Sequence, residues 1–103
     1  MENVDKAIEY WHKVTQISPK SAKAWYNLGR AYIERGDYQK GLAYCRRAVE
    51  IAPSFSMVWN SIGVAYVKLG KQAEALKAFN KALEADPANK IAKKNKDKIL
   101  AKL

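Results

Sequence analysis

Apolar residues recur along this chain at the spacing of three and four positions that one face of an amphipathic helix produces. In residues 22–35, the spacing i, i+3, i+4, i+7 is carried by Trp25, Leu28, Gly29 and Tyr32. A second pattern of the same period follows, carried by Tyr38, Leu42, Cys45, Ala48 and Val49. Gly36 separates the two patterns, and Pro53 follows the second because proline cannot continue a helix. The pattern predicts two helices joined by a tight turn, with Asp37 capping the second helix.

The same arrangement recurs with a period of 34 residues. The three prolines stand at positions 19, 53 and 87, and Trp25 with Trp59 and Gly36 with Gly70 keep the same offset. Aligning residues 22–55 with residues 56–89 gives nine identities in 34 positions, so the repeats have diverged. A fixed period of about 20–50 residues is typical of repeat proteins, in which each unit buries its apolar face against its neighbours.

At these positions the chain resembles the tetratricopeptide repeat (TPR) family, whose pattern is Trp-x2-Leu-Gly-x2-Tyr, then Gly, Ala-x3-Phe, Ala and Pro. Residues 22–55 match it at Trp25, Leu28, Gly29, Tyr32, Gly36, Tyr38, Ala48 and Pro53. Residues 56–89 match it at Trp59, Ile62, Gly63, Tyr66, Gly70, Ala75, Phe79, Ala82 and Pro87. Gly41 and Cys45 depart from the family's alanine and aromatic residue, which predicts looser packing in the first repeat. The resemblance implies an all-α fold, a right-handed helical solenoid of helix-turn-helix repeats.

The residues outside the two full repeats correspond to parts of a repeat. Residues 3–21 align with a second helix that lacks its first helix, and residues 90–103 occupy the place of a first helix. We therefore expect one TPR domain over residues 1–103, made of a half repeat, two full repeats and a capping helix. The capping helix carries mostly polar residues, as a terminal repeat must, with its apolar side expected at Ile91, Ile99, Leu100 and Leu103.

The N-terminal half repeat raises the question of self-association. Its apolar residues include Ile8 and Trp11, part of whose surface would face the absent partner helix. An uncovered apolar face tends to find another surface, so we expect weak self-association through this end of the chain. The alternative is that both side chains fold onto residues 22–35 and leave a monomer.

Composition narrows the class of protein. The chain of 103 residues has 19 Lys and Arg against 10 Asp and Glu, for a formal net charge of +9. One Cys and one His exclude a disulfide framework and a zinc site built from several such ligands. No apolar run approaches the roughly 20 residues that span a bilayer, nothing reads as a signal peptide, and a lone cysteine suits a reducing compartment. We expect a cytoplasmic protein without metal, cofactor or membrane contact.

A second set of residues lies opposite the core stripe of each first helix, as helical geometry dictates. In TPR proteins these positions line a concave groove that binds peptide or helical segments, so the resemblance assigns partner binding to them. The set comprises Lys23, Tyr26, Arg30, Ile33, Met57, Asn60, Val64, Val67, Lys94 and Lys98, and Asn27 is assigned to partner binding with it as a further amide. Its mixture of cations, amides and apolar groups favours an acidic protein segment with hydrophobic anchors, with Asn60 as a hydrogen-bonding amide. The alternative is that these residues are solvated sides of helices.

One specific activity of the family can be tested against the residues. Co-chaperone members grip an acidic C-terminal tail with a two-carboxylate clamp of Lys, Asn and Arg on three successive first helices. Asn27, with Lys23 one turn before it, occupies the place of a clamp asparagine. The next helix has Met57 and Ser61 where the clamp needs Lys and Arg, and the preceding first helix is absent. A complete clamp is therefore disfavoured.

Catalytic and nucleic-acid functions are less well supported. His12 has no identifiable nucleophile partner and is expected to pack or face solvent, while Cys45 falls on a core stripe as an inert thiol. The chain is therefore not expected to be an enzyme.

Polyanion or nucleic-acid binding is the main alternative function, through the basic residues 90–103 and a line of cations on the second helices. That line comprises Lys6, Lys13, Lys40, Arg47, Lys77 and Lys81. A self-assembly module is a third possibility.

Overall fold

The computed structural model describes residues 2–103 and contains six α-helices, with no strand among those residues. The helices are α1 (Glu2–Ile17), α2 (Ala22–Arg35), α3 (Tyr38–Ile51), α4 (Ser56–Lys68), α5 (Gln72–Ala85) and α6 (Lys90–Ala101). This architecture confirms the prediction of an all-α helical-repeat fold. The chain divides into two compact units, the first ending at Pro53 and the second beginning at Ser54. Each unit is described separately below.

Glycine ends the first helix of each full repeat. Gly36 has a φ of 97° and Gly70 a φ of 76°, values in the left-handed region that residues with a Cβ rarely adopt. After each glycine, the next amide reaches back across the last turn: Asp37 donates to the Tyr32 carbonyl at 2.9 Å, and Lys71 to Tyr66 at 2.9 Å. Both helices therefore end in a Schellman-type turn, as the predicted tight turns require.

The helix starts differ from the sequence expectation at one position. Asp37 does precede α3, but its side chain makes no capping hydrogen bond. Its carboxylate instead accepts from the guanidinium of Arg35, with the shorter contact at 2.7 Å. Asp37, with a contribution from Asp5 on α1, raises the pKa of Arg35 above its ordinary value. The prediction that Asp37 caps α3 was wrong, because a neighbouring cation competes for its carboxylate.

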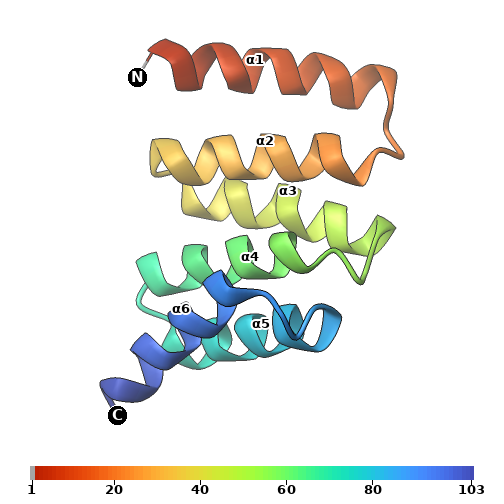
Figure 1. The fold of residues 1–103 in the computed structure, drawn as a ribbon. Helices are drawn as coiled ribbons and strands as arrows, with labels where there is room; N and C mark the ends of the chain where they lie inside the picture. Colours follow the sequence, from red (N-terminus) through yellow and green to blue (C-terminus); the bar gives the residue numbers. More distant parts are fainter. Residues whose placement is uncertain (1) are drawn as a thin grey trace. The chain divides into compact units, whose positions relative to one another are not determined.

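In the first unit, α2 packs against both α1 and α3 (Figure 1). Ile8 of α1 is buried in a cluster with Leu28, Ala31 and Tyr32, and Trp11 packs against that cluster from the side. The N-terminal helix thus folds onto α2, as the monomer alternative required for Ile8 and Trp11. Tyr10 and Ile17 on α1 stay largely exposed, so self-association through this helix remains a prediction.

Two glycines, Gly29 of α2 and Gly41 of α3, lie against each other where these helices pack. A Cβ placed on Gly29 would lie 2.6 Å from the Cys45 sulfur and 2.9 Å from the Gly41 carbonyl oxygen. A Cβ on Gly41 would lie 2.4 Å from Ile33. Cys45 is fully buried. The prediction of looser packing at Gly41 and Cys45 was therefore wrong, because neither glycine leaves room for even one added carbon atom.

In the second unit, the corresponding contact is filled by an aromatic ring. A Cβ on Gly63 of α4 would lie 2.4 Å from the ring of Phe79 on α5, which is fully buried. The helix α6 packs mainly against α5, with Ala92 and Ile99 as its buried positions. The predicted apolar side of α6 was correct only at Ile99, because Ile91, Leu100 and Leu103 are all exposed.

Hydrogen bonds fasten the start of α6 to the other two helices of its unit. The Asn89 side-chain oxygen caps α6 by accepting from the Ala92 amide at 3.0 Å. Its side-chain nitrogen donates to the Ser56 hydroxyl at 2.8 Å, and that hydroxyl donates to the Ala82 carbonyl at 2.7 Å. One asparagine thus ties the first turn of α6 to the start of α4 and the end of α5.

Trp25 and Trp59, which occupy the same position in the two full repeats, each have a cation over the ring. The guanidinium of Arg47 lies 5.7 Å from the centre of the Trp25 ring, and the ammonium of Lys81 lies 5.1 Å from that of Trp59. Arg47 and Lys81 are one 34-residue period apart, as are the two tryptophans. Both tryptophans are half-buried, and a cation over the face of a ring is attracted by its quadrupole.

The close contact between Gly29 and Cys45 predicts that placing the family's aromatic residue at position 45 would destabilise the fold. Cys45→Phe should lower the free energy of unfolding by about 1–3 kcal/mol, because the larger ring must displace backbone as well as side chains. Ala43→Phe adds a ring at an exposed position of α3 and should change it by no more than about 0.5 kcal/mol. Urea denaturation of both variants measures the difference; a Cys45→Phe variant at least as stable as the parent would contradict this packing.

Burial also raises the pKa of the Cys45 thiol to about 12. In the unfolded chain the thiol ionises near pH 8.5, so between these values the folded state holds a proton that the unfolded state has lost. The stabilisation is complete below about pH 8.5 and declines as pH rises, by about 2 kcal/mol at pH 10. Denaturation at pH 7 and pH 10 should show this extra loss in the parent and not in Cys45→Ala. Equal losses in both would mean that the thiol is not protected.

Candidate functional site

The predicted partner-binding residues of the first unit all lie on α2, but only some of them are accessible. Lys23 and Arg30 are exposed, and Asn27 is half-buried. Tyr26 is buried, and the Arg30 guanidinium lies 5.7 Å from the centre of its ring. Ile33 is half-buried, with its side chain directed at Gly41 of α3. The accessible part of this surface is therefore cationic and polar, and its apolar members serve the core.

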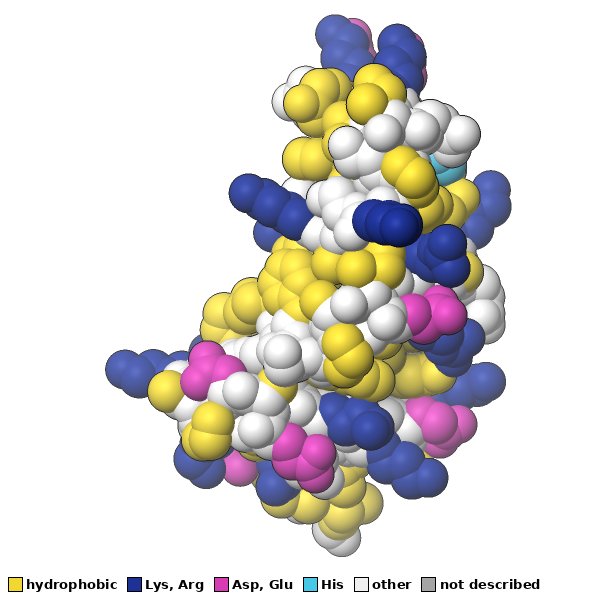
Figure 2. Space-filling view, turned by 90° about the vertical axis from the view of Figure 1, so that its right-hand side faces the viewer, with side chains coloured by type: hydrophobic (Ala, Val, Ile, Leu, Met, Phe, Trp, Pro, Cys, Tyr) yellow, Lys and Arg dark blue, Asp and Glu magenta, His cyan; other side chains and the backbone are white. Residues whose placement is uncertain are grey.

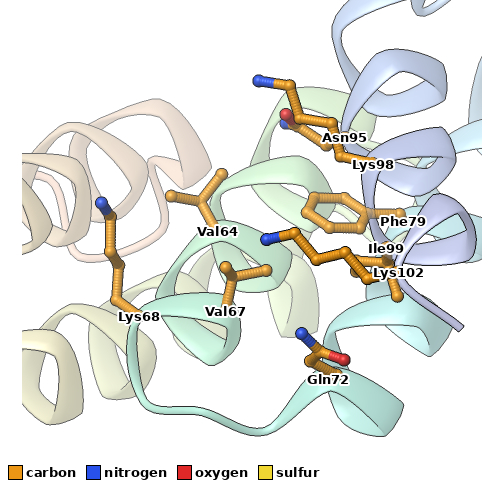
Figure 3. A pocket seen from close by; sticks show the side chains of 9 residues that line it. All are labelled: Val64, Val67, Lys68, Gln72, Phe79, Asn95, Lys98, Ile99 and Lys102. Carbon is orange, nitrogen blue, oxygen red and sulfur yellow. The ribbon is translucent and has the colours of Figure 1, made fainter.

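The second unit contains a pocket between its three helices, which we call the C-terminal pocket. Its floor and walls include Val64 and Val67 of α4, Phe79 of α5 and Ile99 of α6 (Figure 3). Its other lining residues are polar or cationic: Lys68, Gln72, Asn95, Lys98 and Lys102. The pocket has a volume of about 220 Å³. It combines an apolar interior with nitrogen-bearing side chains at its edge.

All charged residues that line the C-terminal pocket are positively charged. Three of its lining residues are lysines, and none is acidic. Lys98 and Lys102 extend from the α6 side of the pocket, and Lys68 lies at the opposite side, at the end of α4 (Figure 3). Two amide side chains, Gln72 and Asn95, add hydrogen-bonding groups. An apolar group flanked by carboxylates is the ligand that such a surface complements.

Asn60 has a different role from the one expected. It is buried, and its side-chain oxygen accepts a hydrogen bond from the Asn95 amide at 3.1 Å. Asn60 therefore fastens α4 to α6, and Asn95 is the amide that lines the pocket. This corrects the expectation that Asn60 offers its amide to a partner. The helical-wheel argument places Asn60 opposite the core stripe, but it takes no account of α6 covering that side.

Three of the predicted residues line the C-terminal pocket: Val64, Val67 and Lys98. Met57 and Lys94 are exposed but lie outside it. Several pocket residues were not predicted, and the repeat period contains a signal for two of them. Lys102 lies one period after Lys68, and Asn95 lies two periods after Asn27. Adding two repeat periods to the position of Asn27, a predicted binding residue, would have found Asn95.

The cations on the second helices are engaged locally. Lys6 pairs with Glu2 at 3.4 Å and Lys13 with Glu9 at 3.5 Å, both within α1. The ammonium of Lys40 lies 5.6 Å from the centre of the Tyr32 ring. With Arg47 and Lys81 over their tryptophans, five of the six cations in this line have a local partner, and all six are exposed. Figure 2 shows one face of the molecule, on which Lys and Arg side chains are spread out and outnumber the acidic ones.

The groups that could do chemistry have packing roles in the structure. The His12 Nε2 lies 2.9 Å from the Tyr32 hydroxyl, and its ring meets those of Tyr32 and Tyr44 edge to face. This agrees with the packing role predicted for His12. Within residues 2–103, no group of three or more His, Cys, Asp and Glu is placed to hold a metal ion. The helices in the same range include none that is both long and apolar enough to cross a membrane.

Comparison with solved structures identifies domains of the same architecture. The first TPR domain of Spaghetti (RPAP3), bound to the HSP90 peptide SRMEEVD, is 26% identical with a TM-score of 0.92, over 98% of this chain and 80% of that one. The second TPR domain of human RPAP3, in complex with the HSP70 peptide SGPTIEEVD, is 28% identical with a TM-score of 0.88. The match covers 94% of this chain and 81% of that one. The Arabidopsis OM64 TPR domain is 22% identical with a TM-score of 0.93, over 99% and 84%, and shows the shared fold.

The family model that matches this sequence names the same kind of repeat as these structures. A search of curated proteins gives no significant match. The family model for the tetratricopeptide repeat matches residues 22–55 and residues 56–89, which together make up more than half of the chain. Together with the six helices and the glycine-ended turns, this match shows that the chain belongs to the tetratricopeptide repeat family.

Proposed function

We propose that this chain is a protein-interaction module that binds an acidic segment carrying a hydrophobic anchor. The observation that carries the proposal is the C-terminal pocket, where Val64, Val67 and Ile99 surround an apolar space bordered by Lys68, Lys98 and Lys102. A branched aliphatic side chain would fill the interior, and carboxylates on either side of it would meet the lysines. The accessible cations of α2, Lys23 and Arg30, offer a second place for acidic groups in the first unit.

The similar structures support a partner of this chemistry. The peptides bound by the two RPAP3 domains, SRMEEVD and SGPTIEEVD, each combine acidic residues with valine next to the last residue. This chain lacks the complete two-carboxylate clamp, because Met57 and Ser61 replace its Lys and Arg and Ser61 is buried. We therefore propose that the carboxylates of the partner are bound by the lysines of the C-terminal pocket rather than by such a clamp.

The alternative functions receive less support. Polyanion binding along the second helices would use cations that the structure places over aromatic rings or beside carboxylates. Self-association would use Tyr10 and Ile17 of α1, and sedimentation at several concentrations would test it. A cytoplasmic location and a non-enzymatic role complete the proposal, since both suit a binding module with a single buried thiol.

The proposal predicts that charge near the C-terminal pocket matters more than the same charge elsewhere. Lys68→Glu should weaken binding of fluorescently labelled SGPTIEEVD at least tenfold at physiological ionic strength, because it replaces attraction by repulsion at the pocket. Lys77→Glu changes the net charge equally but lies on α5 outside the pocket, and should change affinity less than twofold. At that ionic strength the Debye length is about 8 Å, so distant charges are screened.

Fluorescence anisotropy measures both affinities. A peptide with glutamine and asparagine in place of its acidic residues should bind at least tenfold more weakly to the parent chain. Equal losses in Lys68→Glu and Lys77→Glu would indicate general electrostatic attraction and favour the polyanion alternative. Failure of the acidic peptide to bind, or tighter binding of its neutral form, would exclude the proposed acidic partner.

A further inference from the structure

One face of α6 carries lysines at helical spacing and lies beside the C-terminal pocket. Lys90, Lys93, Lys94 and Lys98, together with Asp97 and Ala101, line a second, open hollow of about 500 Å³. We call these residues the α6 lysine face. Steps of three and four positions place them on one side of the helix, away from the buried Ala92 and Ile99.

The charge on the α6 lysine face is largely uncompensated. Asp97 is its one carboxylate, and it pairs with Lys93 at 3.4 Å. Lys90, Lys94 and Lys98 follow one another at intervals of four residues. Like charges at this spacing destabilise a helix by about 0.2–0.5 kcal/mol per pair. A helix face that only had to be polar could mix both signs, so a role for the concentrated positive charge explains why α6 carries this local cost.

The α6 lysine face and the C-terminal pocket share a residue. Lys98 lines both hollows, so a chain that leaves the pocket at Lys98 passes directly onto the row of lysines toward the start of α6. None of the residues that line the face is aromatic. Nucleic-acid bases would therefore find no ring to stack on, whereas a run of carboxylates would find ammonium groups at every turn.

We infer that α6 is the electrostatic half of a two-part binding site, in which the partner's hydrophobic anchor occupies the C-terminal pocket and a run of acidic residues beside it lies along Lys98, Lys94 and Lys90. The inference rests on the proposed function and specifies the partner further: an acidic protein segment whose negative residues extend beyond the anchor by several positions. The helix α6 then both packs against α5 and binds ligand.

The test compares SGPTIEEVD with two extended peptides that carry four additional glutamates at one end or the other. One of the extended peptides should bind the parent chain at least fivefold more tightly than SGPTIEEVD. The double variant Lys90→Glu with Lys94→Glu should abolish this gain, so that it binds the extended and the unextended peptides equally within twofold. Lys71→Glu with Lys77→Glu is the matched control, because it makes the same change of charge at exposed positions outside both hollows, and it should retain the gain.

The outcomes separate the inference from the proposed function. If the parent binds the unextended peptide but neither extension adds affinity, the role of α6 is excluded and the proposed function stands. If the gain is lost equally in both double variants, it reflects net charge and the inference falls. If the parent binds none of the peptides, both fall. Tighter binding of single-stranded RNA than of the extended peptides, lost in Lys90→Glu with Lys94→Glu, would assign the face to nucleic acid instead. Thermal melting checks that each variant is folded.

Discussion

The close packing of the two helices in each full repeat is the constraint on which the other features depend. In the first unit, Gly29 and Gly41 let the backbones of α2 and α3 approach until a Cβ on Gly29 would collide with Cys45 and with the Gly41 carbonyl. In the second unit, the ring of Phe79 lies against Gly63 in the same place. Interiors pack at nearly crystalline density, so each solution fixes the spacing of its helix pair. The two repeats thus fill the same position between their helices with side chains of different volume, Cys45 in the first and Phe79 in the second.

This packing determines which side chains remain for binding. The side of each first helix that faces the second helix is buried, and the exposed residues of α2 are Lys23, Arg30 and Glu34. On α4, the accessible residues include Val67 and Lys68, which meet α6 at the C-terminal pocket. The binding surface we propose is therefore what remains of the first helices after their core contacts are made. Its apolar part survives where α6 covers α4 incompletely.

The positive charge of the chain serves two different purposes. Arg47 and Lys81 lie over tryptophan rings, and Lys6 and Lys13 pair with carboxylates one turn away. Surface pairs of this kind contribute little free energy and need no partner molecule. The lysines of the C-terminal pocket and of α6 are different, because within residues 2–103 Lys93 is the one among them that forms an ion pair with a carboxylate. The excess charge available to a ligand is therefore concentrated at the C-terminal end of the second unit.

The sequence by itself determined the family, the all-α architecture and the position of the turns. These features depend on local properties: the period of apolar residues, the left-handed conformation at Gly36 and Gly70, and the inability of Pro53 and Pro87 to continue a helix. The sequence also indicated a cationic and apolar binding surface, of which Val64, Val67 and Lys98 line the observed pocket.

Only the tertiary structure decided what each polar side chain contacts. Asp37 binds Arg35 instead of capping α3, Asn60 is buried against Asn95, and the apolar residues of α6 divide into buried Ile99 and exposed Ile91 and Leu100. A helical wheel gives the direction of a side chain from its own helix axis, but not which neighbouring helix lies in that direction or how near it is. The Asp37 carboxylate is taken by a cation two residues away, whereas the Asn60 amide is taken by a residue of another helix, which a helical wheel of α4 alone does not contain.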